Sequence, residues 1–308
     1  MAVYNQSFGL RKNPFNMTPD PECLFLTAQH REALVGLNYA ILERKGFVVL
    51  TGDAGTGKTT LLARVLQFLP TRGVRSSVIL NPTLTPSEFL ELTLLDFGLG
   101  EVPSSKAQRL RKLQNLLLDN RSLGRVSVLI IDEAHKLSQE VLEEVRLLGN
   151  FEEPAGKLLQ IIMVGQNELD ELLNREDLRQ LKQRIAVRLS IAPLTPFDVA
   201  PYIRHRWLCA GGDKLPFSPE SIRYIADASN GIPRVINSLC DNALALALSE
   251  GLTTIDARHV RGAAADLQLN VLPPLAMSCE TNGVGPRELR TDVGSTHADY
   301  GFESIPTI

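Results

Sequence analysis

The stretch TGDAGTGKTT at residues 51–60 constrains the fold of this chain more than any other. Gly52, Gly57, Lys58 and Thr59 stand at the fixed positions of the phosphate-binding pattern G-x-x-x-x-G-K-[ST]. Glycines let the backbone curl so that successive N–H groups point at phosphate oxygens. Lys58 is then placed to reach the β- and γ-phosphates of a nucleotide, and the Thr59 hydroxyl to ligate Mg²⁺. The residues expected to contact the nucleotide here are Gly52, Asp53, Ala54, Gly55, Thr56, Gly57, Lys58, Thr59 and Thr60.

The segments on either side of this loop have the patterns of a strand and a helix. Residues 47–51, FVVLT, form an apolar and β-branched run, as a buried strand requires. Residues 60–69, TLLARVLQFL, carry apolar side chains at helical spacing. This order places bound phosphates at a helix N-terminus, where the N–H groups and the helix dipole favour anions. The alternative, a chance glycine-rich turn, does not account for the strand and the helix around it.

A second predicted strand ends in two carboxylates. Residues 125–137, RVSVLIIDEAHKL, open with a continuous aliphatic run, typical of a strand inside a parallel sheet, and reach Asp132 and Glu133. We expect Asp132 to hold the Mg²⁺ shell and Glu133 to polarise an attacking water. On its own such a pair is more often a solvated strand end, but it follows a phosphate loop here. The pair favours ATP hydrolysis over transfer to another acceptor, and GTP is not expected because no guanine-reading N-K-x-D follows.

The first two thirds of the chain alternate strands with helices. A helix start is marked at Thr85 by TPSE, in which Pro86 lies in the first turn and Glu88 completes a capping box. Alternation of this kind predicts an α/β fold, a three-layer doubly wound parallel sheet with ligands at the carboxyl ends of its strands. Further strands are expected at 76–81, 158–165 and 187–194, and further helices at 107–119 and 138–151.

After residue 195 helix starts follow one another without a strand between them. TPFD at 195–198 and SPES at 218–221 place Thr or Ser at the N-cap and Pro at the first helical position, and Asp256 precedes a third helix. Residues 196–269 are therefore expected to form a small all-helical domain. Residues 270–308 contain turn formers and scattered charges without periodicity, which predicts a flexible tail.

The composition is that of an ordinary soluble globule. The 308 residues are 44% hydrophobic and 22% charged, and the net charge of −3 gives no overall attraction to nucleic acid. The four cysteines have no C-x-x-C spacing, so we expect thiols in a reducing compartment and no zinc site. There is no apolar signal-peptide core and no uncharged apolar run of about 18 residues. We therefore expect a cytoplasmic protein without a membrane span.

A phosphate-loop α/β domain followed by a small helical domain resembles the AAA+ ATPases. In that class the strand expected at 158–165 is followed by a polar residue near the γ-phosphate, which corresponds to Gln166, with Asn167 in reserve. The turn Gly-Ile-Pro-Arg at 231–234 resembles the second sensor, so Arg234 would couple the γ-phosphate to the position of the helical lid. An exposed surface charge is the alternative for Arg234.

The same resemblance implies an arginine that reaches the ATP of a neighbouring subunit. The class places it just before the fifth strand, where LRQLKQRIAVRL carries Arg179, Arg184 and Arg188. Arg184 is the expected finger, because Arg188 lies at the start of the strand. Again the alternative is a surface charge.

The resemblance narrows to one branch of this class. FGLRKNPF, TPDP and HREALVGL before the phosphate loop are similar to the general secretion pathway protein A (ExeA-type) ATPases, and LRQLKQRI, YIRHRW and GIPRVINSLCDNAL continue the match. The resemblance implies that residues 1–27 form a strap across an ATPase domain at 28–195, with 196–269 as its lid. It also implies that His30 borders the adenine, although a histidine that caps a helix is the alternative.

The family resemblance implies ATP and Mg²⁺ as cofactors and a homo-oligomer, either a hexameric ring or a filament. Secretion members carry a membrane-spanning helix and a peptidoglycan-binding domain after the ATPase, and neither is expected here. Two functions therefore stay open. The first is a motor ATPase of a secretion, pilus or polysaccharide-export assembly. The second is an ATP-dependent DNA-binding transposition regulator, for which the segment RLRKLQ at 109–114 is only modestly basic and has no interleaved aromatic residues.

Overall fold

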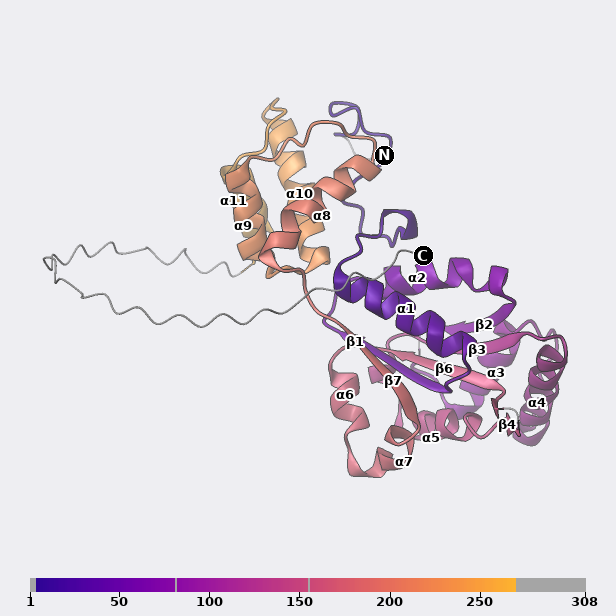
Figure 1. Ribbon diagram of the computed structural model, residues 1–308. Coiled ribbons are helices and arrows are strands. Elements are labelled where there is room, and N and C mark those ends of the chain that lie inside the picture. The colour runs from indigo at the N-terminus through magenta and orange to yellow at the C-terminus, as the bar shows by residue number, and fades with distance from the viewer. Residues whose placement is uncertain (1–3, 81, 155, 270–308) are drawn as a thin grey trace, which may run out of the picture. The chain divides into compact units, whose positions relative to one another are not determined.

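A computed structural model describes residues 4–80, 82–154 and 156–269, and its centre is a five-stranded parallel sheet (Figure 1). The strands lie in the order β2-β3-β6-β1-β7, and every neighbouring pair is parallel. β1, β3 and β6 are buried along their whole length, which explains why their sequences are mostly apolar. The strands are β1 (Phe47–Gly52), β2 (Val74–Ile79), β3 (Val126–Ile131), β6 (Leu159–Val164) and β7 (Ile185–Ile191).

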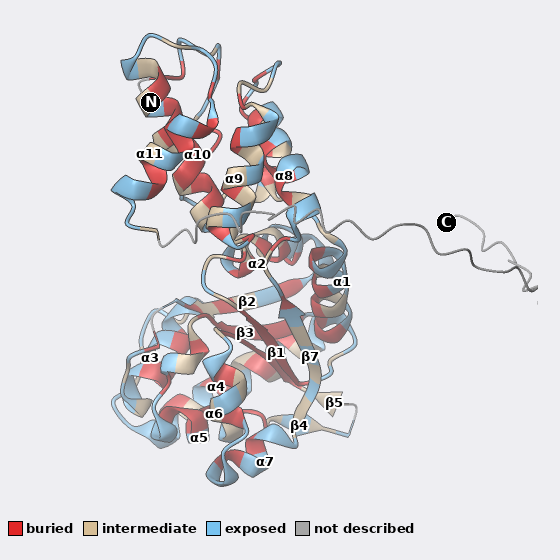
Figure 2. Ribbon diagram, turned by 90° about the vertical axis from the view of Figure 1, so that its left-hand side faces the viewer, coloured by how far each residue is buried: buried red, intermediate tan, exposed pale blue. Residues whose placement is uncertain are grey.

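Helices cover both faces of this sheet, so the α/β part has three layers (Figures 1 and 2). α1 (Ala28–Leu42) and α2 (Lys58–Phe68) bury their apolar sides against one face. The other face is covered by a larger core, to which helices between β2 and β7 contribute. These helices are α3 (Pro86–Asp96), α4 (Lys106–Ser122), α5 (Gln139–Leu148), α6 (Glu168–Leu173) and α7 (Arg179–Lys182). The predicted doubly wound α/β fold is confirmed.

The chain after β7 is helical, as predicted. A separate core holds this region together around Trp207, Leu239 and Leu244, and Tyr4 and Phe15 of the N-terminal segment belong to the same core. The helices are α8 (Pro196–Cys209), α9 (Pro219–Ser229), α10 (Pro233–Ser249) and α11 (Ala257–Asp266). The N-terminal segment therefore packs on the helical region before the chain enters the sheet.

Element boundaries differ from the prediction by a few residues. The capping box of Thr85 and Glu88 is present as predicted. β7 spans residues 185–191 instead of 187–194, because its pairing with β1 ends where Gly52 lies opposite Ile191. α5 ends at Leu148, where the chain turns into a short hairpin of β4 (Glu152–Glu153) and β5 (Gly156–Lys157) that was not predicted. The predicted flexible tail at 270–308 lies outside the described residues.

Among the residues that the structure describes, no helix is both long enough and apolar enough to cross a membrane.

The turn before α10 joins the helical region to the end of the sheet and yields a stability prediction. Gly231 has φ of +71°, and a Cβ atom there would lie 2.0 Å from the carbonyl oxygen of Leu194, whose N–H donates to the Gly231 carbonyl at 2.8 Å. We expect Gly231→Ala to lower the free energy of unfolding by about 2–4 kcal/mol, measured by urea denaturation. Gly251, with φ of +73° and open space around it, is the matched control, and Gly251→Ala should cost only about 1 kcal/mol. Equal losses in the two variants would contradict the steric argument.

Candidate nucleotide-binding site

The predicted phosphate loop lies between β1 and α2, as its sequence pattern requires. Gly57 is the N-cap of α2, so the loop leads directly into a helix N-terminus, the favourable place for an anion. The ammonium of Lys58, only 6% exposed, donates to the carbonyl oxygens of Gly52 at 2.7 Å and Asp53 at 2.8 Å. Burial lowers the pKa of Lys58, and the negative charge of Glu133 and Asp132 partly opposes this effect. The lysine is thus bonded to the loop and feels the charge of two carboxylates.

Asp132 and Thr59 meet although 73 residues separate them. Asp132 follows β3 and its backbone N–H donates to Ile79 at 2.9 Å, which fixes the carboxylate at the carboxyl edge of the sheet. The Thr59 hydroxyl, at the start of α2, donates to Asp132 Oδ2 at 3.2 Å. A carboxylate and a hydroxyl oxygen beside a phosphate loop are the hard oxygen donors that Mg²⁺ prefers. The residues predicted to hold the metal are thus brought together.

Glu133 adopts a backbone conformation that is rare for its residue type. Its φ of 53° lies in the left-handed region, which turns the side chain away from the strand direction. The carboxylate pairs with Lys136 at 2.8 Å and lies 3.8 Å from His135 Nε2. The hydrogen bond from Lys136 is the main cause that holds the pKa of Glu133 below its usual range, so the group is an anion at neutral pH. An anionic carboxylate here is able to accept a proton or orient a water.

The end of β6 brings polar residues to the same edge of the sheet. Gln166 lines the cavity over the phosphate loop, and its backbone N–H donates to His135 Nδ1 at 3.3 Å. Asn167, the reserve for the same role, donates from Nδ2 to Asp53 Oδ1 at 2.5 Å and so contacts the loop itself. The geometry therefore brings both residues to the site, and the role of Gln166 stays a prediction.

Arg234 and Arg184 lie in different places. The N–H of Arg234 donates to the Gly55 carbonyl at 3.2 Å, and the side chain lines the cavity. Arg184 precedes β7 at the opposite edge of the sheet, where its Nη1 donates to the Arg146 carbonyl at 3.0 Å. Arg188 is paired with Asp170 at 2.7 Å. Arg234 therefore belongs to this chain's own site, whereas Arg184 does not line it, and its trans role stays a prediction.

His30 contacts the phosphate loop. Its Nδ1 lies 2.7 Å from the hydroxyl of Thr27, the N-cap of α1, and its Nε2 lies 3.2 Å from the Thr56 carbonyl oxygen. The ring also lines the cavity. Nδ1 therefore has the position expected of a histidine at a helix cap, whereas Nε2 contacts the phosphate loop. Burial lowers the pKa of His30, with the hydrogen bond to Thr56 acting in the opposite direction. The predicted contact with adenine stays a prediction.

This buried histidine predicts a pH dependence of stability. Because the pKa of His30 is lower in the folded protein than its ordinary value of about 6.5, the unfolded chain binds the proton first as the pH falls. The contribution of neutral His30 to the free energy of unfolding is therefore fully present above about pH 6.5, and it is lost as the pH falls toward the folded pKa. We expect the melting temperature to fall more between pH 8 and 5.5 in the parent protein than in His30→Gln. Identical falls would show that His30 does not titrate on unfolding.

The cavity over the phosphate loop has a volume of about 470 Å³, and part of its wall was not predicted. Tyr202, Arg206 and Asn237 of the helical region contribute to it. So does the N-terminal segment, with Asn16, Met17, Thr18, Pro19, Cys23, Leu24 and Phe25. The segments TPDP and YIRHRW, which carry part of the family resemblance, both contribute to this wall. Nothing in the sequence predicted that they would meet at the cavity.

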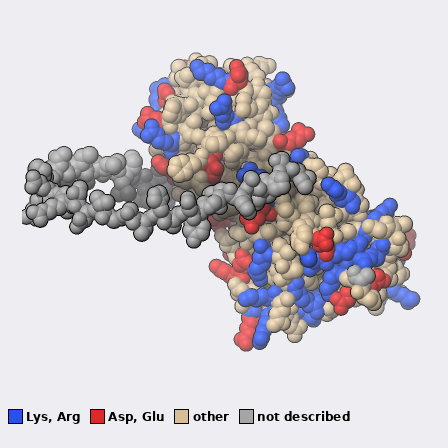
Figure 3. Space-filling model, viewed as in Figure 1, with Lys and Arg blue, Asp and Glu red and all other residues tan. Residues whose placement is uncertain are grey.

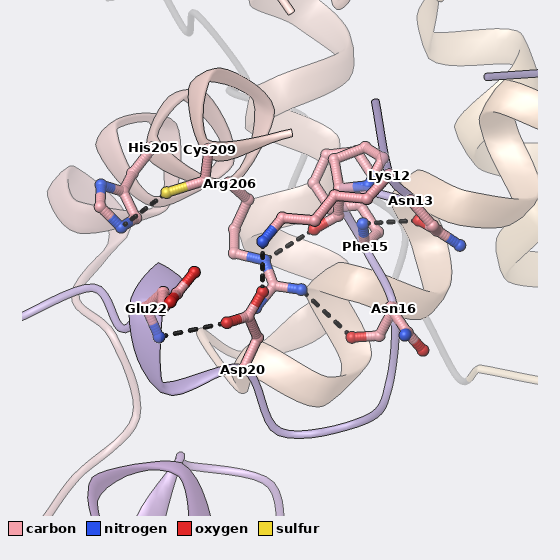
Figure 4. Close-up of polar contacts among 10 residues, drawn as sticks. Lys12, Asn13, Phe15, Asn16, Asp20, Glu22, His205, Arg206 and Cys209 are labelled. Atoms are coloured by element: carbon pink, nitrogen blue, oxygen red, sulfur yellow. Dashed lines mark hydrogen bonds and ion pairs between the residues drawn. The ribbon is translucent and has the colours of Figure 1, made fainter. Parts of the chain in front are cut away.

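Arg206 ties the two parts of this wall together (Figure 4). The buried guanidinium donates from Nε to the Pro14 carbonyl at 2.7 Å and from Nη2 to the Asn16 carbonyl at 3.1 Å. Asp20, which accepts from the Glu22 N–H at 3.1 Å, pairs with Lys12 at 2.6 Å and closes the loop between them. These contacts place the N-terminal segment against α8, where it forms one side of the cavity.

Comparison with known proteins agrees with this geometry. Residues 41–173 match the family described as AAA domain. The chain is 42% identical over 253 residues to general secretion pathway protein A of Aeromonas hydrophila, covering 81% of this chain and 46% of that protein. It is 26% identical over 262 residues to the ATP-dependent target DNA activator B of Escherichia phage Mu, covering 82% of this chain and 76% of the activator.

Solved structures show the same fold at low sequence identity. The ORC2 protein of Aeropyrum pernix, in its ADPNP–ADP complexes, superposes with a TM-score of 0.64 at 18% identity, over 83% of this chain and 71% of that one. The chain spans about half the length of the secretion relative, at 46%. By its own sequence and fold, this chain belongs to the general secretion pathway protein A family of AAA+ ATPases.

Proposed function

We propose that this protein hydrolyses ATP and works as an oligomeric motor or switch. The observation that carries the proposal is the meeting of two chain segments at one edge of the sheet: Lys58 and Thr59 at the phosphate loop, and Asp132 and the anionic Glu133 after β3. A phosphate loop alone would support binding only. The added carboxylate, placed next to the metal-binding pair, supports turnover with water as the acceptor.

Each residue of the site has a defined part in this reaction. Lys58 would leave the two loop carbonyls and donate to the β- and γ-phosphates. The negative charge of the phosphates would stabilise the protonated form of the lysine. Thr59 and Asp132 would hold Mg²⁺, which neutralises charge on the phosphates when bound. Glu133 would orient the attacking water and accept its proton. Gln166 would donate to the γ-phosphate from the cavity wall.

Arg234 supports a coupling between nucleotide and lid. Its backbone binds the phosphate loop at Gly55 while its helix, α10, belongs to the core of the helical region. A γ-phosphate that attracts the Arg234 guanidinium would therefore pull on α10 as a whole. Hydrolysis would remove that attraction, which gives the helical region two positions that depend on the nucleotide.

Two biological roles for this ATPase are supported by different relatives. The 42% identity to general secretion pathway protein A favours a role in a secretion, pilus or polysaccharide-export assembly, in the cytoplasm where ATP is supplied. The target DNA activator B is ATP-dependent by its name and matches along 82% of this chain, which favours the alternative of a DNA-binding transposition regulator. We favour the first setting because the identity is much higher.

The experiment combines turnover with DNA binding. The purified chain should release phosphate from ATP and not from GTP, and Asp132→Asn should abolish the release. An electrophoretic mobility shift with duplex DNA, with ATP and with ADP, separates the two settings. ATP-dependent binding in a physiological salt range would support the transposition-type regulator, and no shift under either condition would support the assembly motor. A chain without phosphate release from any nucleotide would contradict the proposal.

A further inference from the structure

The edge of the sheet opposite the nucleotide site has an unusual surface. α1, α2 and α4 each run back antiparallel to the strands, so their C-terminal ends lie at the amino edge of the sheet. α1 ends at Leu42 before β1, α2 at Phe68 before β2, and α4 at Ser122 before β3. Strand pairing therefore gathers three helix ends that are distant in sequence, on the side away from the cavity.

Cations gather at these helix ends. Figure 3 shows Lys and Arg side chains concentrated over the end of α1 and the starts of β2 and β3. The Arg44 guanidinium donates from Nη2 to the Arg125 carbonyl at 3.2 Å, and the Val126 N–H donates to the Gly73 carbonyl at 3.1 Å, which brings Arg72 beside Arg125. We call this surface the basic edge; its cations are Arg44, Lys45, Arg64, Arg72, Arg75, Arg121 and Arg125.

Three arginines of the basic edge form no ion pair with the residues that the structure describes. Within the described residues, Arg44, Arg72 and Arg125 have no carboxylate within ion-pair distance. Three carboxylates, Glu43, Asp96 and Asp119, belong to the same helix ends and turns, against seven cations. Burial and the nearby charge of Arg121 lower the pKa of Arg44, as expected where like charges are crowded. This local positive excess stands out in a chain whose net charge is −3.

Apolar side chains project among these cations. Leu123 is 64% exposed between Arg121 and Arg125, Phe68 is 44% exposed and Leu42 is 40% exposed. The Arg64 guanidinium lies 4.7 Å from the centre of the Phe68 ring, so cation and aromatic ring share one surface. Single exposed apolar residues are common on proteins. Here each of the three helix ends carries one, and each is within four residues of an arginine in the sequence.

We propose that the basic edge docks on the surface of a lipid bilayer rich in anionic headgroups. Lysines and arginines are attracted to such a surface, and leucine and phenylalanine side chains enter the boundary between headgroups and acyl chains. A nucleic acid also attracts cations, but it offers no apolar phase to cover Leu123, Phe68 and Leu42. The mixed composition therefore favours the bilayer. This inference does not depend on ATP hydrolysis, because the nucleotide cavity lies at the other edge and stays accessible.

Vesicle flotation of the full chain tests the proposal. We expect the protein to float with vesicles of phosphatidylcholine and phosphatidylglycerol and to stay at the bottom with phosphatidylcholine alone. Arg44→Gln/Arg72→Gln/Arg125→Gln should weaken partitioning at low salt by on the order of 10²-fold, since each basic residue contributes to the attraction. The matched control, Arg204→Gln/Lys214→Gln/Arg223→Gln, removes three exposed cations from the helical region and should bind as the parent does.

A gain-of-signal variant keeps the test independent of lost stability. Trp207 is the single tryptophan of the chain and is buried, so Leu123→Trp adds one exposed reporter. Its emission should shift to shorter wavelength with anionic vesicles and not with neutral ones or with duplex DNA. Melting temperatures of all variants establish that they are folded. Equal flotation with neutral vesicles, unchanged flotation of the Arg44/Arg72/Arg125 variant, or a reporter that responds only to DNA would each overturn the proposal, the last in favour of a nucleic-acid partner.

Discussion

Glu133→Gln should bind ATP as tightly as the parent protein and hydrolyse it on the order of 10²–10⁴-fold more slowly. The substitution keeps the shape and the hydrogen-bonding reach of the side chain but removes the group that accepts a proton from water. The amide oxygen of glutamine is still able to accept the bond from Lys136, but the amide carries no negative charge and takes no proton from water. Fluorescent-nucleotide titration and steady-state phosphate release measure the two quantities separately.

Two further variants fix the interpretation of this result. Lys58→Ala should lose nucleotide affinity itself, because the ammonium contacts phosphates in the ground state as well as during reaction. Glu140→Gln removes an exposed carboxylate from the first turn of α5 and should leave both affinity and rate at parent values. If Glu133→Gln turns over at the parent rate, another group activates the water, and Gln166 and Asn167 at the end of β6 are the next to examine.

The geometry of the predicted phosphate loop followed from the sequence because the pattern is local. Gly52 to Thr60 form one loop and one helix start, so the pattern alone predicted their geometry. The sequence also predicted that Thr59 and Asp132 would lie close together, since the carboxyl ends of parallel strands meet at one edge of the sheet. The strand order was not, because β6 lies between β3 and β1 and no local pattern encodes which buried strand takes the middle.

The wall of the cavity shows where local reasoning stops. Arg206 binds the carbonyl groups of Pro14 and Asn16, which are 192 and 190 residues away. Backbone carbonyls are present at every residue, so a sequence offers no sign of which ones a buried arginine will bind. The hairpin of β4 and β5 is too short to have a periodicity, and α7 spans only four residues. Such elements depend on tertiary packing, not on local propensity.

The predicted role of Arg184 is not visible in the structure of one chain, because its predicted partner is the ATP bound to another copy of the chain. In this structure its guanidinium donates to the Arg146 carbonyl at 3.0 Å and lies at the edge of the sheet away from the cavity. Lys58 and Glu133 alone leave charge that develops on the γ-phosphate without a cation opposite it. An arginine supplied by a neighbouring subunit typically raises the rate by on the order of 10³-fold or more.

Arg184→Ala should therefore bind ATP normally and remain on the order of 10³-fold slow at every protein concentration. Specific activity of the parent protein should rise with concentration, and ATP should favour a larger species than ADP, as sedimentation across a dilution series would record. Arg188→Ala is the matched control, since it removes a nearby arginine, in β7, that is already paired with Asp170, and it should keep the parent rate.

Mixing separates a role in trans from a local structural effect. Lys58→Ala cannot bind ATP but retains Arg184, so at a mixed interface it lends that arginine to the intact phosphate loop of Arg184→Ala. Two inactive proteins should then give activity together, with a maximum near equal amounts. A local effect of Arg184 on β7 through its bond to Arg146 would be carried into every mixture and would give no recovery. A parent protein that stays monomeric with concentration-independent turnover, and a mixture without activity, would leave Arg184 as a surface charge and the site as one that works within a single chain.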